Sequence, residues 1–152
     1  GEVAAAAHNI SHDAADPVSF SFHYRHRKWV IATDIGVITD SVLQALSGAD
    51  LAVLESNHDR DMLKNGPYPG FLKQRIMGQY GHLSNHDAAA VLARIPRKDK
   101  MRVFLAHLSQ QNNQPSLAFK TVSGYLQQQG CEPGKDIEIH LTHPDTTVSF
   151  TG

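Results

Sequence analysis

Three potential metal ligands follow short apolar segments of the sequence. His107 comes directly after the apolar run 101–106, Asp34 follows residues 30–33, and His12 ends a shorter stretch near the start of the chain. In α/β proteins the carboxyl ends of neighbouring buried strands meet at one edge of the sheet, and functional sites are built there. Imidazole nitrogens and a carboxylate at such an edge suit a divalent metal ion. The sequence therefore predicts that these three side chains converge on a metal site.

Each of these residues also has an ordinary explanation. A carboxylate at a strand end can cap a helix, and a histidine can be a hydrogen-bonded core or loop residue. His82 follows Gly81 and precedes a predicted helix start, so it can be a proton donor or a cap. His58 and Asp59 follow the apolar run 51–54 and can either support the site or cap the next helix. The ten histidines in 152 residues favour the site interpretation.

Composition limits the class of protein. A chain of 152 residues is long enough for one domain with a modest core. The formal net charge of −1 gives no global electrostatic argument for or against nucleic acid as a partner. Cys131 is the only cysteine, so an intrachain disulfide and a thiolate zinc cluster are both excluded. No apolar run approaches the roughly 20 residues needed to cross a bilayer, and no signal peptide is evident. We therefore expect a cytoplasmic protein that does not contact a membrane.

The order of the predicted elements indicates a mixed α/β sheet with helices on one face. Residues 17–26 alternate between apolar and polar, which predicts a half-buried strand, and a basic turn joins it to a second strand at 29–33. Buried strands then alternate with helices along the rest of the chain. The expected helices are 39–46, 60–64, 70–80, 85–95 and 115–129, and the other expected strands are 2–10, 51–54, 102–106, 137–141 and 147–150.

Five strings carry a resemblance to a known family. The strings are His12-Asp-Ala-Ala-Asp-Pro17, Ala32-Thr-Asp-Ile-Gly36, Leu54-Glu-Ser-Asn-His-Asp59, Gly81-His-Leu-Ser-Asn85, and Leu105-Ala-His-Leu-Ser109 with Asn112-Asn113. They resemble the C-terminal half of the metallo-β-lactamase superfamily, and within it the YycJ/WalJ-like metal-dependent hydrolases. The resemblance extends from about residue 3 to residue 125.

The resemblance implies one half of an αββα sandwich with two zinc or manganese ions at its edge. By the matching strings, His12 resembles a ligand of one ion, Asp34 the carboxylate that bridges both, and His107 the last histidine ligand of the other. His82 resembles the histidine that donates a proton to the leaving group in the tRNase Z branch. The possible supporting residues are Asp13, His58, Asp59 and Asn112.

The superfamily's H-x-H-x-D-H motif is absent from residues 1–152. The chain is therefore expected to be the C-terminal half of the domain, with the N-terminal half and its ligands missing. Two ligands for each ion predict weak or partial metal binding by this chain alone. The sheet face that the missing half would cover is expected to bind that half or to self-associate.

The function that the resemblance implies is hydrolysis of nucleic-acid phosphodiesters, in the manner of a DNA exonuclease. The basic groups at 25–28 and 94–100 can contact a phosphate backbone or simply be solvated turns. One alternative is a non-catalytic half-domain or assembly fragment. Another is hydrolysis of a non-phosphate ester or thioester, against which the string that contains His82 argues.

Overall fold

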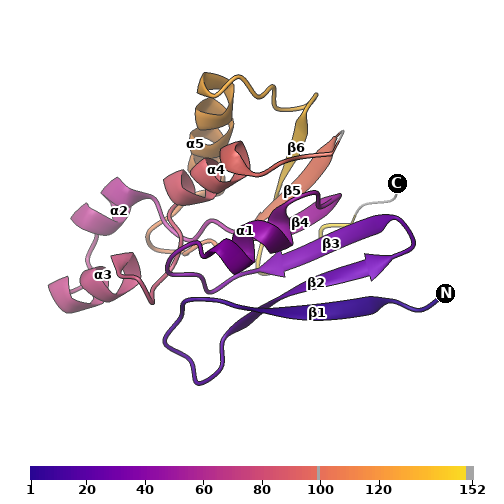
Figure 1. Ribbon diagram of the computed structural model, residues 1–152. Coiled ribbons are helices and arrows are strands. Elements are labelled where there is room, and N and C mark those ends of the chain that lie inside the picture. Colours follow the sequence, from indigo (N-terminus) through magenta and orange to yellow (C-terminus); the bar gives the residue numbers. More distant parts are fainter. Residues whose placement is uncertain (99, 150–152) are drawn as a thin grey trace.

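One alternating strand, several nearly continuous apolar strands and the helices between the later strands form a single six-stranded sheet (Figure 1). The computed structural model describes residues 1–98 and 100–149. The strands lie side by side in chain order; the first three pair antiparallel and the last four parallel. The strands are β1 (Ala4–Asn9), β2 (Val18–Tyr24), β3 (Arg27–Ala32), β4 (Leu51–Glu55), β5 (Met101–Ala106) and β6 (Ile137–Leu141).

Helical crossovers join the parallel strands, as parallel pairing requires. The helices are α1 (Asp40–Leu46), α2 (Arg60–Asn65), α3 (Gly70–Met77), α4 (Asn85–Arg94) and α5 (Pro115–Gln128). Figure 1 shows α1, α4 and α5 on one side of the sheet, with α2 and α3 beyond the carboxyl end of β3. The predicted mixed α/β sheet with helices on one face is thus confirmed. Among the described residues, no helix is both long and apolar enough to cross a membrane.

The core lies between the sheet and the three covering helices. Val30, Leu54 and Leu105, from the three central strands, are fully buried there. The opposite face of the sheet is also apolar, but it is open: Phe20 is 42% exposed and its cross-strand partner Ile31 is 44% exposed. In β2 the buried face instead carries Ser19 and Ser21. The sheet therefore has apolar side chains on both faces and covering helices on only one.

The predictions for two segments were wrong. Residues 147–149 do not form the expected strand, and residue 150 lies outside the described part of the chain. Val148 lines an apolar hollow on the open face together with Val53 and Phe104, so its segment packs across the sheet instead of pairing at the edge. The helix expected at 70–80 ends at Met77 because Gly78 begins a turn that the Gly81 amide closes by donating to the Gly78 carbonyl.

Candidate metal centre

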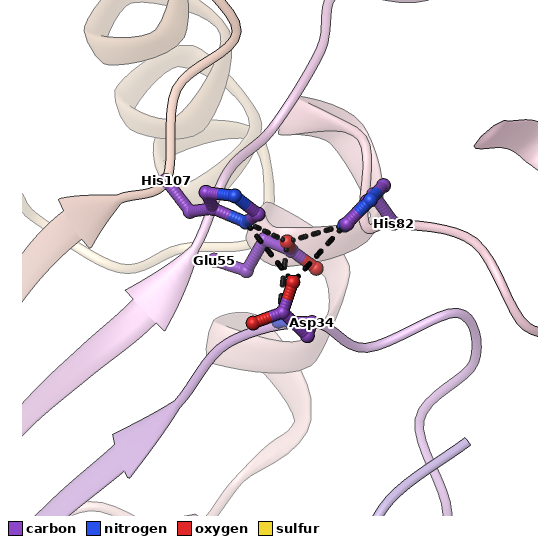
Figure 2. Close-up of side chains that lie close together, drawn as sticks. All are labelled: Asp34, Glu55, His82 and His107. Carbon is purple, nitrogen blue, oxygen red and sulfur yellow. Dashed lines mark hydrogen bonds and ion pairs between the residues drawn. The ribbon is translucent and has the colours of Figure 1, made fainter. Parts of the chain in front are cut away.

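Three neighbouring strands bring the candidate ligands together. Asp34 follows β3, Glu55 is the last residue of β4, and His107 follows β5. These strands are parallel and in register, so their carboxyl ends lie at one edge of the sheet. His82 reaches the same point from the loop before α4, as Figure 2 shows.

The side chains of these four residues form one compact cluster. Each residue contributes a potential ligand atom, and these atoms all lie within 4.8 Å of one another. The Nδ1 atoms of His107 and His82 lie 3.6 Å and 3.8 Å from the Asp34 Oδ1 atom. The two imidazole rings meet edge to face, with centroids 5.1 Å apart. Imidazole nitrogens and carboxylate oxygens at this spacing are a donor set that fits a divalent metal ion.

His12 joins the cluster at its rim. Its Nε2 atom lies 3.9 Å from Asp34 Oδ1 and 3.4 Å from Asp13 Oδ1. Its ring centroid is 5.3 Å from that of His82. The structure thus brings His12, Asp34 and His107 around one carboxylate oxygen, as expected for a shared site. His82 lies as near to Asp34 as His107 does, so the geometry suits His82 both as a ligand and as a proton donor.

The sequence reasoning missed Glu55, which is the centre of the cluster. Its side chain is fully buried and accepts five hydrogen bonds. The donors are the backbone amides of Asp34 (3.2 Å), Ile35 (2.9 Å) and Leu83 (3.0 Å) and the Nδ1 atoms of His82 (2.8 Å) and His107 (2.7 Å). A carboxylate has about four lone-pair sites, so little acceptor capacity remains for an ion. We therefore interpret Glu55 as the residue that orients the two histidines. The signal was available, because Glu55 ends a buried strand as Asp34 and His107 do.

The hydrogen bonds to Glu55 determine its charge state. Burial opposes the charged form, but the bonds from His107 and His82, and then those from the backbone amides of Ile35 and Leu83, outweigh burial and hold the pKa of Glu55 at about 2. The hydrogen bond between His107 and Glu55 also raises the pKa of His107 above its usual value, against the effect of partial burial. Glu55 is therefore an anion at neutral pH.

An ionised carboxylate can only accept hydrogen bonds, so the Nδ1 atoms of His82 and His107 both carry a hydrogen. In a neutral ring this leaves Nε2 as the free ligand atom. Carboxylates hold metal-binding histidines in this way in many metalloproteins. The donor set thus agrees with metal binding.

Backbone strain is concentrated at two of the candidate ligands. Asp34 and His107 have φ angles of +59° and +56°, in the left-handed region that residues other than glycine seldom occupy. Such conformations cost about 1–3 kcal/mol and occur where surrounding contacts hold them. The Asn57 side chain donates to the His107 carbonyl at 2.8 Å, and Glu55 accepts from the Asp34 amide.

A buried amide network fixes the loops behind the cluster. The Asn85 side chain donates to Asn113 Oδ1 at 2.9 Å, and Asn113 donates to the carbonyl oxygens of Ser56 and Asn57 at 2.9 Å and 3.0 Å. This network joins the loops after β4 and β5 to the start of α4. The cap of α4 is Ser84, whose hydroxyl accepts from the Asp87 amide.

The four expected supporting residues have different places. Asp13 lines the same cleft as His12 and His107. Asp59 caps α2 by accepting from two backbone amides, so its role as a cap is the one seen. Asn112 is buried; its carbonyl accepts from the Asp59 amide, and its side-chain amide has no hydrogen-bond partner among the described residues.

His58 is the fourth of these residues, and it predicts how stability depends on pH. It is 2% exposed, and burial lowers its pKa to about 4. In the unfolded chain the pKa returns to about 6.5, so between pH 6.5 and pH 4 the unfolded state binds a proton that the folded state does not. The free energy of unfolding should therefore fall by up to about 3 kcal/mol as the pH is lowered through this window.

Urea denaturation at a series of pH values measures this effect. His58→Gln should flatten the dependence between pH 6.5 and pH 5, whatever its effect on absolute stability. The contribution of Glu55 is lost only at lower pH, as the pH falls from about 4.5 toward 2, so the two effects are separable. Equal slopes in the parent and the variant would contradict the assignment to His58.

Comparisons with known proteins agree with this fold and site. The chain is 40% identical over 144 residues to exodeoxyribonuclease YycJ of Bacillus anthracis, covering 95% of this chain and 54% of that protein. It is 34% identical over 151 residues to exodeoxyribonuclease WalJ of Streptococcus pneumoniae serotype 2 (strain D39 / NCTC 7466), covering 99% and 56%. No family model matches the chain.

Solved structures resemble the chain at low sequence identity. The metallo-β-lactamase fold protein YhfI of Bacillus subtilis superposes with a TM-score of 0.61 at 15% identity, covering 92% of this chain and 46% of that one. Zn²⁺-bound PqqB of Methylobacterium extorquens gives a TM-score of 0.57 at 15% identity, covering 97% and 50%. The chain has the metallo-β-lactamase fold. Within that class its sequence is related to the exodeoxyribonucleases YycJ and WalJ, which confirms the resemblance seen in the five strings, and it spans about half the length of these relatives.

Proposed function

We propose that this chain carries part of the metal site of a DNA phosphodiesterase that acts as an exonuclease. The observation that supports this is the convergence of Asp34, His82 and His107 around buried Glu55 in a relative of two exodeoxyribonucleases. In this proposal His12 binds one zinc or manganese ion, Asp34 binds both ions, and His107 binds the other.

The residues of this chain orient ligands and move a proton. Two bound ions would activate a water molecule and neutralise the charge of the phosphate. Glu55 fixes His82 through Nδ1, so in the cationic ring Nε2 carries the second proton and can release it to the leaving oxygen, which leaves the ring neutral. His107 is held by the same carboxylate oxygen, so one buried group aligns a metal ligand with the proton donor.

Paired substitutions test these roles. In the full gene product, His82→Ala should reduce DNA hydrolysis by roughly 10²- to 10⁴-fold and leave the metal content unchanged, because a proton donor is lost but no ligand. His107→Ala should lower both metal content and hydrolysis. His86→Ala is the control, because His86 packs against Tyr125 on the helical layer.

Metal content by atomic emission and release of nucleotides from end-labelled DNA with Mn²⁺ or Zn²⁺ are the measurements. Loss of metal from the His82 variant would make His82 a ligand and overturn its role as the acid. Normal hydrolysis by the His107 variant would overturn the proposed site.

We also propose that residues 1–152 are the C-terminal half of the domain. The ligands of the H-x-H-x-D-H motif would then come from an N-terminal half, which would cover the open face around Phe20 and Ile31. Binding of a second copy at that face, and a cytoplasmic location, belong to the same proposal. The intact mass of the expressed gene product tests for the N-terminal half. Tight uptake of two ions by the 152-residue chain alone would contradict the half-site, and no uptake by the full gene product would favour the non-catalytic alternative.

A further inference from the structure

Helix α3 presents an unusual surface beside the candidate metal centre. Each of its eight described residues is at least partly exposed, although the helix contains four apolar side chains. Phe71 is 74% exposed, Met77 is 53% exposed, and Tyr80, just after the helix, is 55% exposed. Figure 1 shows the helix set apart from the sheet. Apolar side chains grouped in this way mark a binding surface.

Leu72 and Ile76 of α3, together with Tyr80, form part of one wall of the cleft that contains the site, whereas Phe71 and Met77 do not line this cleft. The cleft has a volume of about 310 Å³. His12, His82 and His107 line it on the side of the metal centre. Tyr68, Leu72, Ile76 and Tyr80 line it from α3 and its flanking turns, and these four side chains are called the aromatic wall below.

The aromatic wall is fixed relative to the histidines. Arg75 of α3 donates from Nε to Asp13 Oδ2 at 2.7 Å, next to His12. The amide of His82 donates to the carbonyl of Ile76 at 2.9 Å, which joins the end of α3 to the proposed proton donor. The distance between the wall and the metal centre is therefore set by direct contacts and does not depend on a mobile segment.

One cation lies in the cleft beside these aromatic side chains. Arg75 lines the cleft and pairs there with Asp13, and residues 62–86 also contain Lys64 and Lys73 but no aspartate or glutamate. Aromatic rings beside cations are the surface on which single-stranded nucleic acid binds, because every base has a flat face that can stack. Inside a duplex the faces of each base are covered by the neighbouring pairs, so such a wall favours an unpaired base.

We infer that the aromatic wall stacks the base of an unpaired nucleotide at the end of a DNA strand, with Tyr68 and Tyr80 as the stacking residues. The substrate class is therefore a single-stranded or frayed DNA end. This inference rests on the proposed function for its choice of ligand. A cleft of about 310 Å³ is near the lower limit for small-molecule sites, which suits one nucleotide.

Binding without metal tests the inference apart from catalysis. Fluorescence anisotropy of a labelled oligothymidylate is measured with the 152-residue chain in EDTA, beside a blunt duplex of the same length. The single strand should bind more tightly than the duplex. Tyr80→Leu and Tyr68→Leu should each weaken single-strand binding by about 5- to 100-fold, whereas the Phe variants should keep it. Phe119→Leu, a change on the exposed surface of α5, is the matched control and should have no effect.

A probe with abasic end nucleotides separates stacking from contacts to phosphate. The parent chain should bind this probe as weakly as Tyr80→Leu binds the normal strand, and the two changes together should cost no more than one alone. Four outcomes would each overturn the inference. Two concern the variants: Tyr80→Leu and Phe119→Leu have equal effects, or the losses from Tyr80→Leu and from the abasic probe are additive. The other two concern the parent chain: it binds the blunt duplex as tightly as the single strand, or it does not bind the single strand.

Hydrolysis by the same tyrosine variants of the full gene product, measured with Mn²⁺ or Zn²⁺, distinguishes the inference from the proposed function. If the tyrosine variants hydrolyse DNA as the parent does, the proposed nuclease function stands and the aromatic wall has no role in it. If binding depends on the tyrosines but the full gene product does not hydrolyse DNA, the aromatic wall is a single-strand binding site and the proposed nuclease function is wrong.

Discussion

Glu55→Gln is expected to disable the metal centre while the sheet still forms. The substitution keeps the shape of the side chain but replaces an acceptor by the amide NH₂. The amide oxygen can still accept from the buried Ile35 and Leu83 amides. The NH₂ group then faces the Nδ1 atoms of His82 and His107, which can pair with it only by becoming acceptors.

That exchange moves the hydrogen of each neutral ring to Nε2, the atom that in the parent is left free for a metal in His107 and for the transferred proton in His82. Metal affinity should fall by about 10- to 100-fold, as is usual when a supporting carboxylate is removed. DNA hydrolysis should fall by roughly 10³-fold or more, because the ligand and the proton donor lose their orientation together. The free energy of unfolding should fall by about 3 kcal/mol, which corresponds to the shift in the Glu55 pKa from 4.5 to about 2.

Nitrogen NMR of the imidazole rings and metal calorimetry measure these changes. The pKa of His107 should fall in the variant, because the hydrogen bond to Glu55 is the main cause that raises it. The matched control is Glu138→Gln, which removes a partly exposed carboxylate that pairs with Lys100 and Arg102. It should leave metal affinity unchanged. Unaltered tautomers and metal affinity in Glu55→Gln would show that Glu55 does not orient the ligands.

Functional side chains that directly follow buried strands are the part of the site that could be predicted from the sequence. Asp34 and His107 were found because each follows an apolar run, and the parallel order of β3, β4 and β5 brings them together. Glu55 also follows an apolar run, and it lies in the string 54–59. It was not recognised because its function is to hold other side chains and not to bind the metal. The supporting role of Asn113 also depends on contacts between distant loops, and no local pattern encodes such contacts.

Burial was harder to predict than element type. The alternation in β2 located the strand correctly, but its aromatic residues lie on the open face and its serines on the covered one. Alternation gives two faces and does not say which of them a helix covers. In α3 the apolar residues Phe71 and Met77 likewise remain exposed, although an apolar helical pattern ordinarily indicates a core-facing side.

Gly36→Ala is expected to be strongly disruptive although it adds only one methyl group near the site. A Cβ atom at Gly36 would lie 2.1 Å from the carbonyl oxygen of Gln79 and 2.7 Å from the amide nitrogen of Gly81. Both are backbone atoms, so the loop before His82 would have to move. The Gly36 amide also donates to the Ser11 carbonyl at 2.7 Å, which ties the same point to the segment before His12.

The substitution should therefore separate His12 and His82 from Asp34 and lower the free energy of unfolding by about 3 kcal/mol. Displacement of catalytic groups by about 1 Å can lower turnover by roughly 10²-fold, so hydrolysis should fall as well. Gly124→Ala is the matched control: it lies inside α5, where an added Cβ would meet no described atom within 4 Å. Alanine there should raise stability by about 0.5–1 kcal/mol. Urea denaturation of both variants measures the contrast, and a change of the same sign in the two proteins would mean that the close approach at Gly36 does not hold the loop of His82 in place.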